Sequence, residues 1–584
     1  MMPPVEVESV LALDIGSIFT RAILFDVVDG QYRFIASGTA PSTANAPFCD
    51  ISEGMHTALT NLEQVTGQTL LDDRSQLILP TRSTDGAGVD RMVITFSAGP
   101  ELRLVVMGLL GEVSLDSANR LAAATYGKVV EKIALNDHRR EDTQIDAIVR
   151  ARPDLIILAG GTDQGASRSV LQMAEVAALA CKVLPEGHRP QVIYSGNQVL
   201  AQKIKESLEG LTPTFVTPNV RPSIDFETLD AAQETLSKVV SDVRLQQLGG
   251  LASAAVMCSA PVRPTAYAFG RVMRFLSKLY DPVKGVLGVD IGSASTTLAA
   301  AYDGKLHLNV LRSYGMGSGL SGALAGLTPD EICQWLPVNL AQQTVMDYLW
   351  QKSLFPASIP MTSEALMIEQ AALRALLRHA VLQLSSRLGR GEPGFEPILA
   401  SGTSIVQAAT PFQSLLALLD GIQPVGVTTV VLDPNNLAAP LGAIADFNSL
   451  LPVQVFDSGA FANLGTVVCP VSRARVGTPI MRIRLDYEDG NTTQMEIRQG
   501  AILRLPVSTG QTVRLQLNGL RGTLVEPRKK LSSLGFKVTG GLCGIVVDAR
   551  GRPLPQPTDL KRRIDLNRQW QQMLSDRKPV KTGQ

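Results

Sequence analysis

The 584-residue sequence lacks the features that mark several large classes of protein. Its six cysteines lie far apart and form no C-x-x-C pair, which predicts reduced, mostly structural thiols. Its five histidines include no pair at metal-ligand spacing, so a histidine-based metal site is not expected. No apolar stretch reaches membrane-spanning length without a glycine, proline or charge. The N-terminus has no basic region followed by an apolar core, so we expect no secretory signal and a cytoplasmic location.

The chain also lacks net charge, with 54 basic and 54 acidic side chains, but the two kinds are unevenly distributed. From Val471 onward there are 21 Lys and Arg against 9 Asp and Glu, so the tail is basic and the preceding body is acidic. The positive charges are spread along strand-like segments and not gathered in one tract, so nucleic-acid binding is not expected. A solvated face, or a face that docks onto the acidic body or an acidic partner, would explain them.

What the sequence does contain is an internal repeat. Residues Val10–Ser17 return 276 positions later as Val286–Ser293, and seven of fifteen aligned positions are identical. Each copy is an apolar run that ends in Asp-Ile-Gly-Ser and continues into a second apolar run, which is typical of two strands joined by a tight turn. The glycine is expected to allow a positive φ and a close approach to phosphate oxygens. Two such hairpins predict two related lobes that bind one polyphosphate from opposite sides.

Strands alternate with helices along most of the chain, which predicts an α/β protein with parallel sheets. A helix is expected over 117–127, with Ser114 or Asp116 as its cap. The chain is too long for a single hydrophobic core. We predict a first lobe over 8–265, a second lobe over 266–450 and a basic, β-rich module over 451–584 that ends in a helix from about Asp559 to Leu574.

Two Asp-Ile-Gly-Ser hairpins in two lobes resemble the actin, sugar kinase and Hsp70 superfamily of ATPases. Within it, several passages resemble the glutamate mutase accessory protein L family, often called MutL and unrelated to the mismatch-repair protein of that name. These passages are 102–109, 158–163, 194–197, 314–319 and 541–554. The resemblance implies a two-lobed actin-like fold, that is, a duplicated ribonuclease H-like fold with a C-terminal β-rich module. It also implies a protein that binds ATP and activates or repairs an adenosylcobalamin-dependent mutase, which would be its protein partner.

The resemblance further implies a nucleotide site. Asp14 and its repeat counterpart Asp290 are the expected catalytic residues and hold Mg²⁺ through water. Other residues are expected to bind the phosphates and the adenosine of ATP; they are Gly16, Ser17, Thr20, Arg21, Gly292, Ser293, Ser295, Thr296, Ser401, Gly402 and Thr403. The superfamily's adenosine turn usually has adjacent glycines, whereas Ala400–Thr403 has one, so an ordinary turn is an equal alternative there. Slow ATP hydrolysis is expected, although no residue that orients the attacking water can be named.

Two other functions stay open. A small-molecule kinase of the same fold needs a general base, for which Asp163 is the candidate, although capping of a helix over 167–182 explains that residue as well. An actin-like scaffold or filament protein would expose an amphipathic anchor, and residues 560–574 have some of that character. Packing of their apolar side chains onto the β-rich module is the simpler explanation.

Overall fold

The structure is a computed structural model that describes residues 8–389, 394–525 and 534–575. Contacts between its residues divide the chain into two compact units. Unit 1 comprises the described parts of Met1–Val272, Leu308–Arg312 and Ala439–Val455. Unit 2 comprises the described parts of Met273–His307, Ser313–Ala438 and Phe456–Gln584. Within the described ranges no helix is long and apolar enough to cross a membrane.

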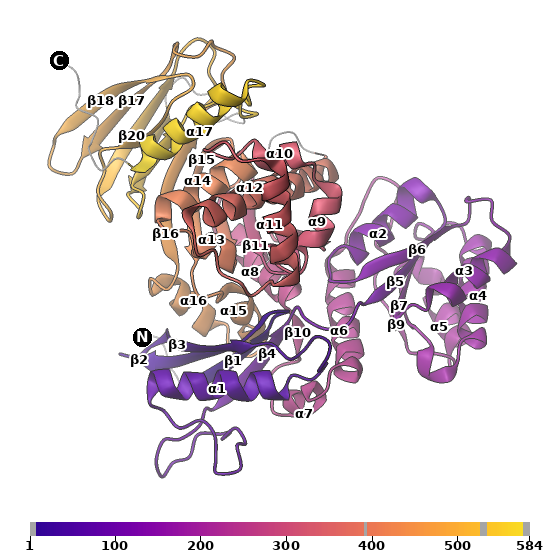
Figure 1. The fold of residues 1–584 in the computed structure, drawn as a ribbon. Helices are drawn as coiled ribbons and strands as arrows, with labels where there is room; N and C mark the ends of the chain where they lie inside the picture. Colours follow the sequence, from indigo (N-terminus) through magenta and orange to yellow (C-terminus); the bar gives the residue numbers. More distant parts are fainter. Residues whose placement is uncertain (1–7, 390–393, 526–533, 576–584) are drawn as a thin grey trace. The chain divides into compact units, whose positions relative to one another are not determined.

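The first sheet of unit 1 is built around the first copy of the repeat (Figure 1). Its order is β10-β4-β1-β2-β3, with β1 antiparallel to β2, β2 antiparallel to β3, and β4 parallel to both β1 and β10. The strands are β1 (Val10–Ile15), β2 (Phe19–Val28), β3 (Gln31–Pro41), β4 (Arg91–Phe96) and β10 (Arg263–Pro264). Helix α1 (Ser52–Thr66) packs so closely on this sheet that a Cβ atom at Gly38 would collide with its backbone.

Unit 2 repeats this sheet and then extends it. The order β13-β12-β11-β14-β15 matches the order in unit 1, and β11 again pairs antiparallel with the strand after its turn and parallel with β14. The strands are β11 (Val286–Ile291), β12 (Ser295–Tyr302), β13 (Lys305–Arg312), β14 (Ile398–Ser401) and β15 (Gly426–Asp433). Residues Leu308–Arg312 of the edge strand β13 are grouped with unit 1. The predicted duplicated ribonuclease H-like arrangement of an actin-like ATPase is therefore confirmed by strand order.

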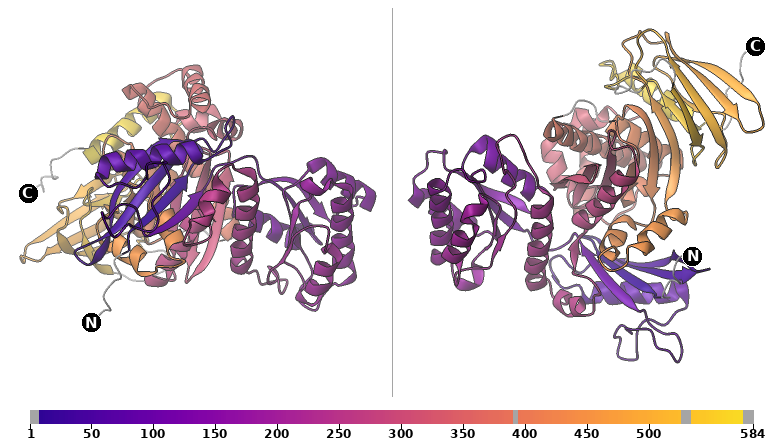
Figure 2. Two further views of the ribbon diagram at one scale, coloured as in Figure 1. Left: turned by 90° about the horizontal axis from the view of Figure 1, so that it is seen from below. Right: turned by 180° about the vertical axis from the view of Figure 1, so that it is seen from behind.

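Between β4 and β10, unit 1 carries an inserted α/β domain with a sheet of its own (Figure 2). The order is β6-β5-β7-β8-β9 and all neighbours are parallel, which is the flavodoxin-like order. The strands are β5 (Arg103–Gly108), β6 (Lys128–Ala134), β7 (Leu155–Ala159), β8 (Gln191–Tyr194) and β9 (Thr214–Val216). The parallel pairing that the alternation of elements predicts is confirmed here.

Helices cover both faces of the inserted sheet. Alternate strand residues such as Val105, Ile156 and Val192 form one core with α3 (Glu141–Ala151), α4 (Arg168–Val183) and α5 (Ala201–Leu208). Because successive strand side chains point to opposite faces, the other buried residues face α2 and α6, which contact the same sheet. These two helices span Asp116–Ala122 and Asp230–Gln247.

The helix expected over 117–127 differs from the observed one. Helix α2 is shorter and is preceded by a π-helical turn at Gly111–Leu115. Its N-cap is Leu115, with no capping side chain, so the expected cap at Ser114 or Asp116 is wrong. The hydroxyl of Ser114 instead accepts a hydrogen bond from the Leu110 N–H inside the π-helical turn. Asp116 is already the first residue of the helix.

The remaining helices join these sheets or cover them. In unit 1, α15 packs on the first part of α8, where a Cβ atom at Gly442 would collide with the backbone of Ala268. Asp446, which follows α15, forms ion pairs with Arg263 of β10 and Arg271 of α8. These and the other helices are α7 (Leu251–Val256), α8 (Thr265–Leu279), α9 (Leu320–Gly326), α10 (Pro329–Cys333), α11 (Gln342–Leu354), α12 (Ser363–Leu388), α13 (Thr403–Val406), α14 (Pro411–Ile422), α15 (Ala438–Ile444) and α16 (Leu450–Asp457).

The C-terminal part of the chain is rich in strands, as predicted. An antiparallel sheet in the order β18-β17-β20-β21 has its own hydrogen bonds, whereas β16, β22 and β19 continue the main sheet of unit 2. The buried side chains of the two sheets form one hydrophobic core. The strands are β16 (Ala462–Cys469), β17 (Pro479–Tyr487), β18 (Thr492–Arg498), β19 (Ile502–Leu505), β20 (Thr512–Gly519), β21 (Leu534–Thr539) and β22 (Ile545–Asp548). Helix α17 (Leu560–Ser575) contacts β19 and α14, and its Trp570 and Leu574 are buried. Internal packing therefore accounts for its apolar face.

A buried cluster of charges ties the tail to the rest of unit 2. Arg550 donates to Asp548 and to Asp420 of α14, which also accepts from Arg374 of α12. Burial opposes the ionisation of Asp548, but the charges of Arg550 and Arg552 outweigh it and hold the pKa of that carboxyl well below its ordinary value. The guanidinium of Arg550 also lies over the Trp570 ring, 4.8 Å from its centroid.

We expect Arg550→Ala to lower the free energy of unfolding of unit 2 by about 3–5 kcal/mol, because it removes one of the two arginines that pair with each of two buried carboxylates. All three tryptophans, Trp335, Trp350 and Trp570, lie in unit 2, so urea denaturation followed by tryptophan fluorescence reports on this unit. Arg498→Ala, which breaks an exposed pair with Glu496, is the control and should change the free energy by no more than about 0.5 kcal/mol. Equal effects of the two substitutions would contradict the structural role of the cluster.

Candidate functional site

The first hairpin turns directly after Asp14, near the carboxyl end of β1. The N–H of Gly16 donates to the Phe19 carbonyl at 2.9 Å and closes the turn. A Cβ atom at Gly16 would lie 2.8 Å from that carbonyl oxygen, so a side chain has no room there. The expected positive φ is wrong, because neither Gly16 nor Gly292 is among the described residues with one. Glycine is required here for close packing and not for an unusual backbone conformation.

The second hairpin closes in the same way. Gly292 donates to the Ser295 carbonyl at 3.0 Å, and a Cβ atom would lie 3.2 Å from that oxygen. The glycine-rich segment 314–319 packs behind its tip, since the N–H groups of Gly317 and Gly319 both donate to the Ser293 carbonyl at 2.9 Å. Side chains at Gly315 and Gly319 would collide with the backbone of the turn. This glycine-rich segment therefore supports the second hairpin.

Asp14 is fixed by hydroxyl groups from two neighbouring elements. Thr95, at the matching position of β4, donates to Asp14 Oδ1 at 2.8 Å, and Thr265, at the start of α8, donates to the same oxygen at 3.0 Å. Oδ2 lies 3.6 Å from Arg21 Nη1. Asp14 is 6% exposed, so its carboxylate is held in one orientation at the sheet edge. Sequence reasoning missed both threonines, although they stand where the neighbouring strands end.

Asp290 has an equivalent position in unit 2. It pairs in register with Ser401 of β14, as Asp14 pairs with Thr95, and Ser401 in turn pairs with Asp433 of β15. The Ser401 hydroxyl donates to Asn436 Oδ1 at 3.1 Å, and Asp433 accepts from the N–H groups that open α15. Gly402 has φ of 113°, and a Cβ atom there would collide with the backbone of Ile291. The predicted adenosine turn thus lies directly beside the residue that follows Asp290.

The structure separates the threonines of the hairpins from the two aspartates. Thr20 is buried beside Gly54 of α1. Because side chains alternate between the two faces of a sheet, Thr20 lies on the opposite face of the sheet from Arg21 and Asp14. Thr296 is likewise buried and donates to the Tyr314 carbonyl. The residue that faces Asp290 across the hairpin is Thr297, which sequence reasoning missed. The sequence could have indicated Thr297, because this residue aligns with Arg21 in the repeat.

The other predicted residues lie at or next to the turns. The Ser17 carbonyl accepts from Asn45 Nδ2, and Asn45 Oδ1 accepts from the Gly99 N–H, so Asn45 braces the first turn. The Ser293 hydroxyl accepts from the Ser318 N–H at 3.1 Å. Ser295 opens β12 and is half-buried. Thr403 is the first residue of α13, directly after the turn at Gly402.

Asp163 does not cap α4, so that explanation of the residue is wrong. The N-cap is Ser167, and no side chain caps the helix. The Asp163 carboxylate instead accepts from the Gln198 N–H at 3.2 Å and from Asn219 Nδ2 at 3.0 Å. It thereby joins the loops that follow β7, β8 and β9 in the inserted domain. Asp163 follows a strand of the inserted sheet, whereas Asp14 lies in β1 of the first sheet.

The residues around Asp14 fit a magnesium ion that is held mainly by water and phosphate. Mg²⁺ in nucleotide sites is usually bound through one or two carboxylates, several waters and the phosphates of the substrate. Asp14 Oδ1 accepts from two hydroxyl donors, whereas Oδ2 lies 3.6 Å from Arg21 Nη1. Across the described ranges no group of three or more His, Cys, Asp or Glu side chains is placed to hold a metal by itself. A single carboxylate ligand is consistent with both observations.

Comparison with known proteins identifies the family. Residues 10–459 match the model of the MutL protein family. Protein MutL of Clostridium tetanomorphum is 23% identical over 303 residues, which cover 51% of this chain and 59% of that protein. The chain therefore spans about three fifths of the length of this curated relative.

Solved structures resemble the chain at low sequence identity. A nucleotide-free acetone carboxylase has a TM-score of 0.33 at 13% identity, with 85% of this chain and 81% of the other covered. The activator of 2-hydroxyisocaproyl-CoA dehydratase from Clostridium difficile with bound ADPNP has a TM-score of 0.28 at 10% identity, with 77% and 96% covered. Xylulose kinase from Bifidobacterium adolescentis has a TM-score of 0.27 at 12% identity, with 77% and 93% covered. Because these scores are low, the fold assignment rests on the strand order of the two sheets and on the family model. Since that model spans most of the sequence, this chain belongs to the MutL protein family.

Proposed function

We propose that this protein binds Mg·ATP through its two hairpins and uses the nucleotide, with slow hydrolysis, to activate or repair an adenosylcobalamin-dependent mutase of the glutamate mutase type. The observation that carries the nucleotide part is the duplication of one local structure. Each hairpin has the same closing hydrogen bond, an aspartate before the turn and a hydroxyl residue at the end of the parallel neighbour strand. The identity of the partner is supported by membership of the MutL family.

These residues would contribute to phosphoryl transfer mainly through electrostatic stabilisation. Phosphoryl transfer depends on positioning and on stabilisation of charge that develops on phosphate oxygens. Ser17 and Ser293 at the turns offer N–H and hydroxyl groups to the phosphates, and Arg21 offers a positive charge on the Asp14 side. Bound Mg²⁺ would neutralise phosphate charge. Asp14 is suited to orient its water ligands because two threonine hydroxyls already fix the carboxylate.

The kinase alternative gains no support from Asp163. A general base must reach the hydroxyl that it deprotonates. Asp163 belongs to the inserted domain, and its Oδ1 is engaged by Gln198 and Asn219. The scaffold alternative is weakened because Ile564, Trp570 and Leu574 of α17 are buried inside unit 2. We therefore retain the ATP-dependent accessory function.

Asp14→Asn should weaken the binding of Mg·ATP at least tenfold, or by about 1.4 kcal/mol, because the charge that faces the metal is lost. The asparagine oxygen can still accept from Thr95 and Thr265, so the fold should be retained. Isothermal titration calorimetry of the full chain measures the affinity, and circular dichroism checks the fold. Asp73→Asn, at an exposed aspartate of unit 1, is the matched control. Wild-type affinity in the Asp14 variant would remove this residue from the site.

Asp290→Asn should reduce the affinity for Mg·ATP to a comparable degree if both hairpins bind the same nucleotide. In that case wild-type protein should bind one nucleotide per chain, and each single variant should lower the affinity of that one site. The same calorimetric titration measures the stoichiometry and affinity of the wild type and both variants. Two nucleotides per chain, or an effect of Asp14→Asn alone, would contradict a shared nucleotide.

The accessory role predicts that the protein restores a mutase that has lost activity during turnover. Inactivated holo-mutase from the same organism, mixed with this protein, Mg²⁺ and ATP, should regain activity, whereas a mixture with the Asp14→Asn variant should not. The assay follows mutase product over time, with ATP omitted in a parallel sample. Unchanged mutase activity together with normal ATP binding would refute the accessory role and leave the nucleotide site intact.

A further inference from the structure

Two loops at one end of the antiparallel sheet in the tail form a groove in unit 2. One loop connects β16 to β17, and the other follows β20. We call this the arginine groove. Its volume is about 790 Å³, which is within the range of small-molecule sites. The polar side chains that line it belong to Ser472, Arg473, Arg475, Thr478 and Arg521.

Hydrogen bonds hold the two loops together. Val471 and Leu524 exchange two backbone hydrogen bonds, of 2.8 and 2.9 Å. The buried Thr523 hydroxyl donates to Ser472 Oγ at 3.1 Å, and the Ala474 N–H donates to the same oxygen at 3.2 Å. Because Ser472 Oγ accepts both of these bonds, its own hydrogen can be donated to a ligand in the groove.

The side chains that line the groove carry positive charge and no negative charge. Arg473, Arg475 and Arg521 are exposed, and none of them forms an ion pair with another residue in the described ranges. No aspartate or glutamate lines the groove. Guanidinium groups are donors only, so this lining is suited to a ligand with several negatively charged acceptor atoms.

The chain around the groove uses arginine and no other charged residue. Residues 458–485 and 497–525 contain four arginines each, and no lysine, aspartate or glutamate. Lysine would supply the same charge, but only arginine has a planar fork of N–H donors that binds two oxygens of one phosphate or carboxylate group. The preference for arginine therefore favours recognition of an oxyanion over a general positive charge.

Arg521 has a backbone conformation that is unusual for its residue type. Its φ is 53° and that of Gly522 is 74°, in a turn closed by a hydrogen bond of 3.0 Å from the Thr523 N–H to the Leu520 carbonyl. Turns with positive φ at both central positions favour glycine, asparagine and aspartate. Residues in sparsely populated conformations are enriched at ligand sites. Arginine at this position thus loses stability but brings a guanidinium group to the groove.

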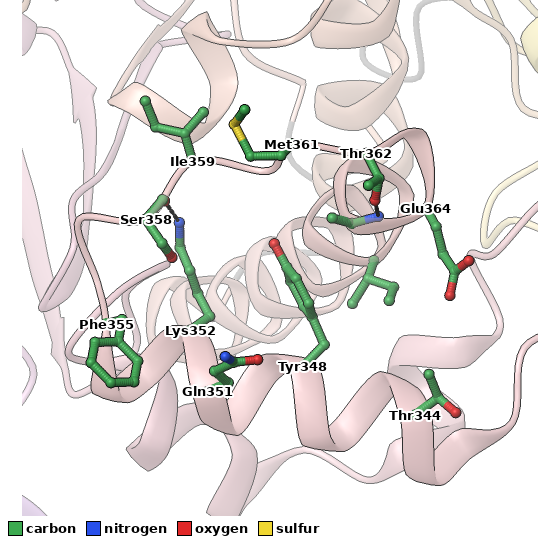
Figure 3. Close-up of a pocket in the computed structure, with 12 residues that line it drawn as sticks. Thr344, Tyr348, Gln351, Lys352, Phe355, Ser358, Ile359, Met361, Thr362 and Glu364 are labelled. Atoms are coloured by element: carbon green, nitrogen blue, oxygen red, sulfur yellow. Dashed lines mark hydrogen bonds between the residues drawn. The ribbon is translucent and has the colours of Figure 1, made fainter.

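A second groove of unit 2, between α11 and α12, differs in its charges (Figure 3). Lys352 Nζ lies 3.1 Å from Glu369 Oε1, and the Tyr348 hydroxyl donates to the same oxygen at 2.8 Å. These groups satisfy one another, and nothing in the structure shows what covers that groove. The lining of the arginine groove, in contrast, defines the charge of the molecule that fits it.

We propose that the arginine groove binds a small organic molecule that carries two or more phosphoryl groups. A phosphate monoester has a charge of about −1.5 to −2 near pH 7 and three terminal oxygens, so two such groups match three guanidinium groups better than single carboxylates do. Ser472 and Thr478 add hydroxyl donors, and Val471 and Leu524 offer apolar contact to a carbon skeleton. The groove contains no residue of either hairpin, so this binding is separate from the nucleotide site.

The test is a calorimetric titration of the full-length protein with inorganic pyrophosphate in Mg²⁺-free buffer. We expect Arg473→Gln and Arg475→Gln each to weaken binding by about fivefold, because each removes a charge-assisted contact. Arg514→Gln is the matched control and should bind normally, since Arg514 is exposed on β20 of the same sheet but does not line the groove. Citrate, which has a similar charge without phosphoryl groups, should bind about fivefold more weakly than pyrophosphate.

Arg521→Asn separates a role in binding from a role in folding. Asparagine tolerates positive φ, so the midpoint of urea denaturation should stay the same or rise. Binding of pyrophosphate should nevertheless weaken by about fivefold, because one guanidinium group is lost. A lower midpoint together with weaker binding would indicate a structural role for Arg521 and would contradict the proposal at this residue.

Four other results would overturn the proposal. They are no binding of pyrophosphate, equal losses in Arg514→Gln and the groove variants, no loss in any groove variant, and citrate bound as tightly as pyrophosphate. Vesicles that contain phosphatidylglycerol are a further probe. If the wild type binds them but not pyrophosphate, and the groove variants do not bind them, the groove recognises a membrane surface instead. Titration of the groove variants with Mg·ATP should give wild-type affinity, which keeps this test distinct from that of the hairpins.

Discussion

The structure depends on a tight turn that follows an aspartate at the end of a buried strand. In both units the glycine N–H is used to close this turn, and a side chain at the glycine would collide with or crowd the carbonyl that accepts the bond. The turn therefore fixes where the chain reverses and keeps Asp14 and Asp290 at the edge of their sheets. A parallel neighbour then brings a hydroxyl residue, Thr95 or Ser401, into register with each aspartate. The same tight turn therefore produces a sheet edge with polar side chains in each unit.

Unit 1 shows how a large insertion can leave such an edge intact. The inserted domain has its own parallel sheet and its own core, so its apolar side chains are satisfied without residues of the first sheet. The chain returns through the two-residue strand β10, and Thr265 follows directly. Its hydroxyl then completes the bonds to Asp14. The short strand is sufficient because its task is to position one hydroxyl group beside β4.

The repeat and the alternation of strands and helices predicted the fold class because they reflect local patterns of burial. The separate sheet of the insertion was not foreseen, since strand order depends on pairing between residues far apart in sequence. The same reason explains why Thr95, Thr265 and Thr297 were missed, because a lone threonine at a strand end has no distinctive pattern. A glycine can be required either by crowding or by a positive φ, and the residue type alone does not tell which. The positive φ expected at Gly16 was wrong because crowding is the cause there. Only coordinates separate those two causes.

The charge asymmetry of the chain has more than one cause. Part of the basic surplus of the tail is structural, since buried Arg550 bonds to Asp420 in the acidic body and to Asp548 in the tail. Such a cluster favours one docking of the tail, because any other arrangement would leave a buried charge unpaired. Other tail arginines, such as Arg482 and Arg498, are exposed on the antiparallel sheet. Docking onto the acidic body and solvation of a basic face therefore both occur, each for a different set of arginines.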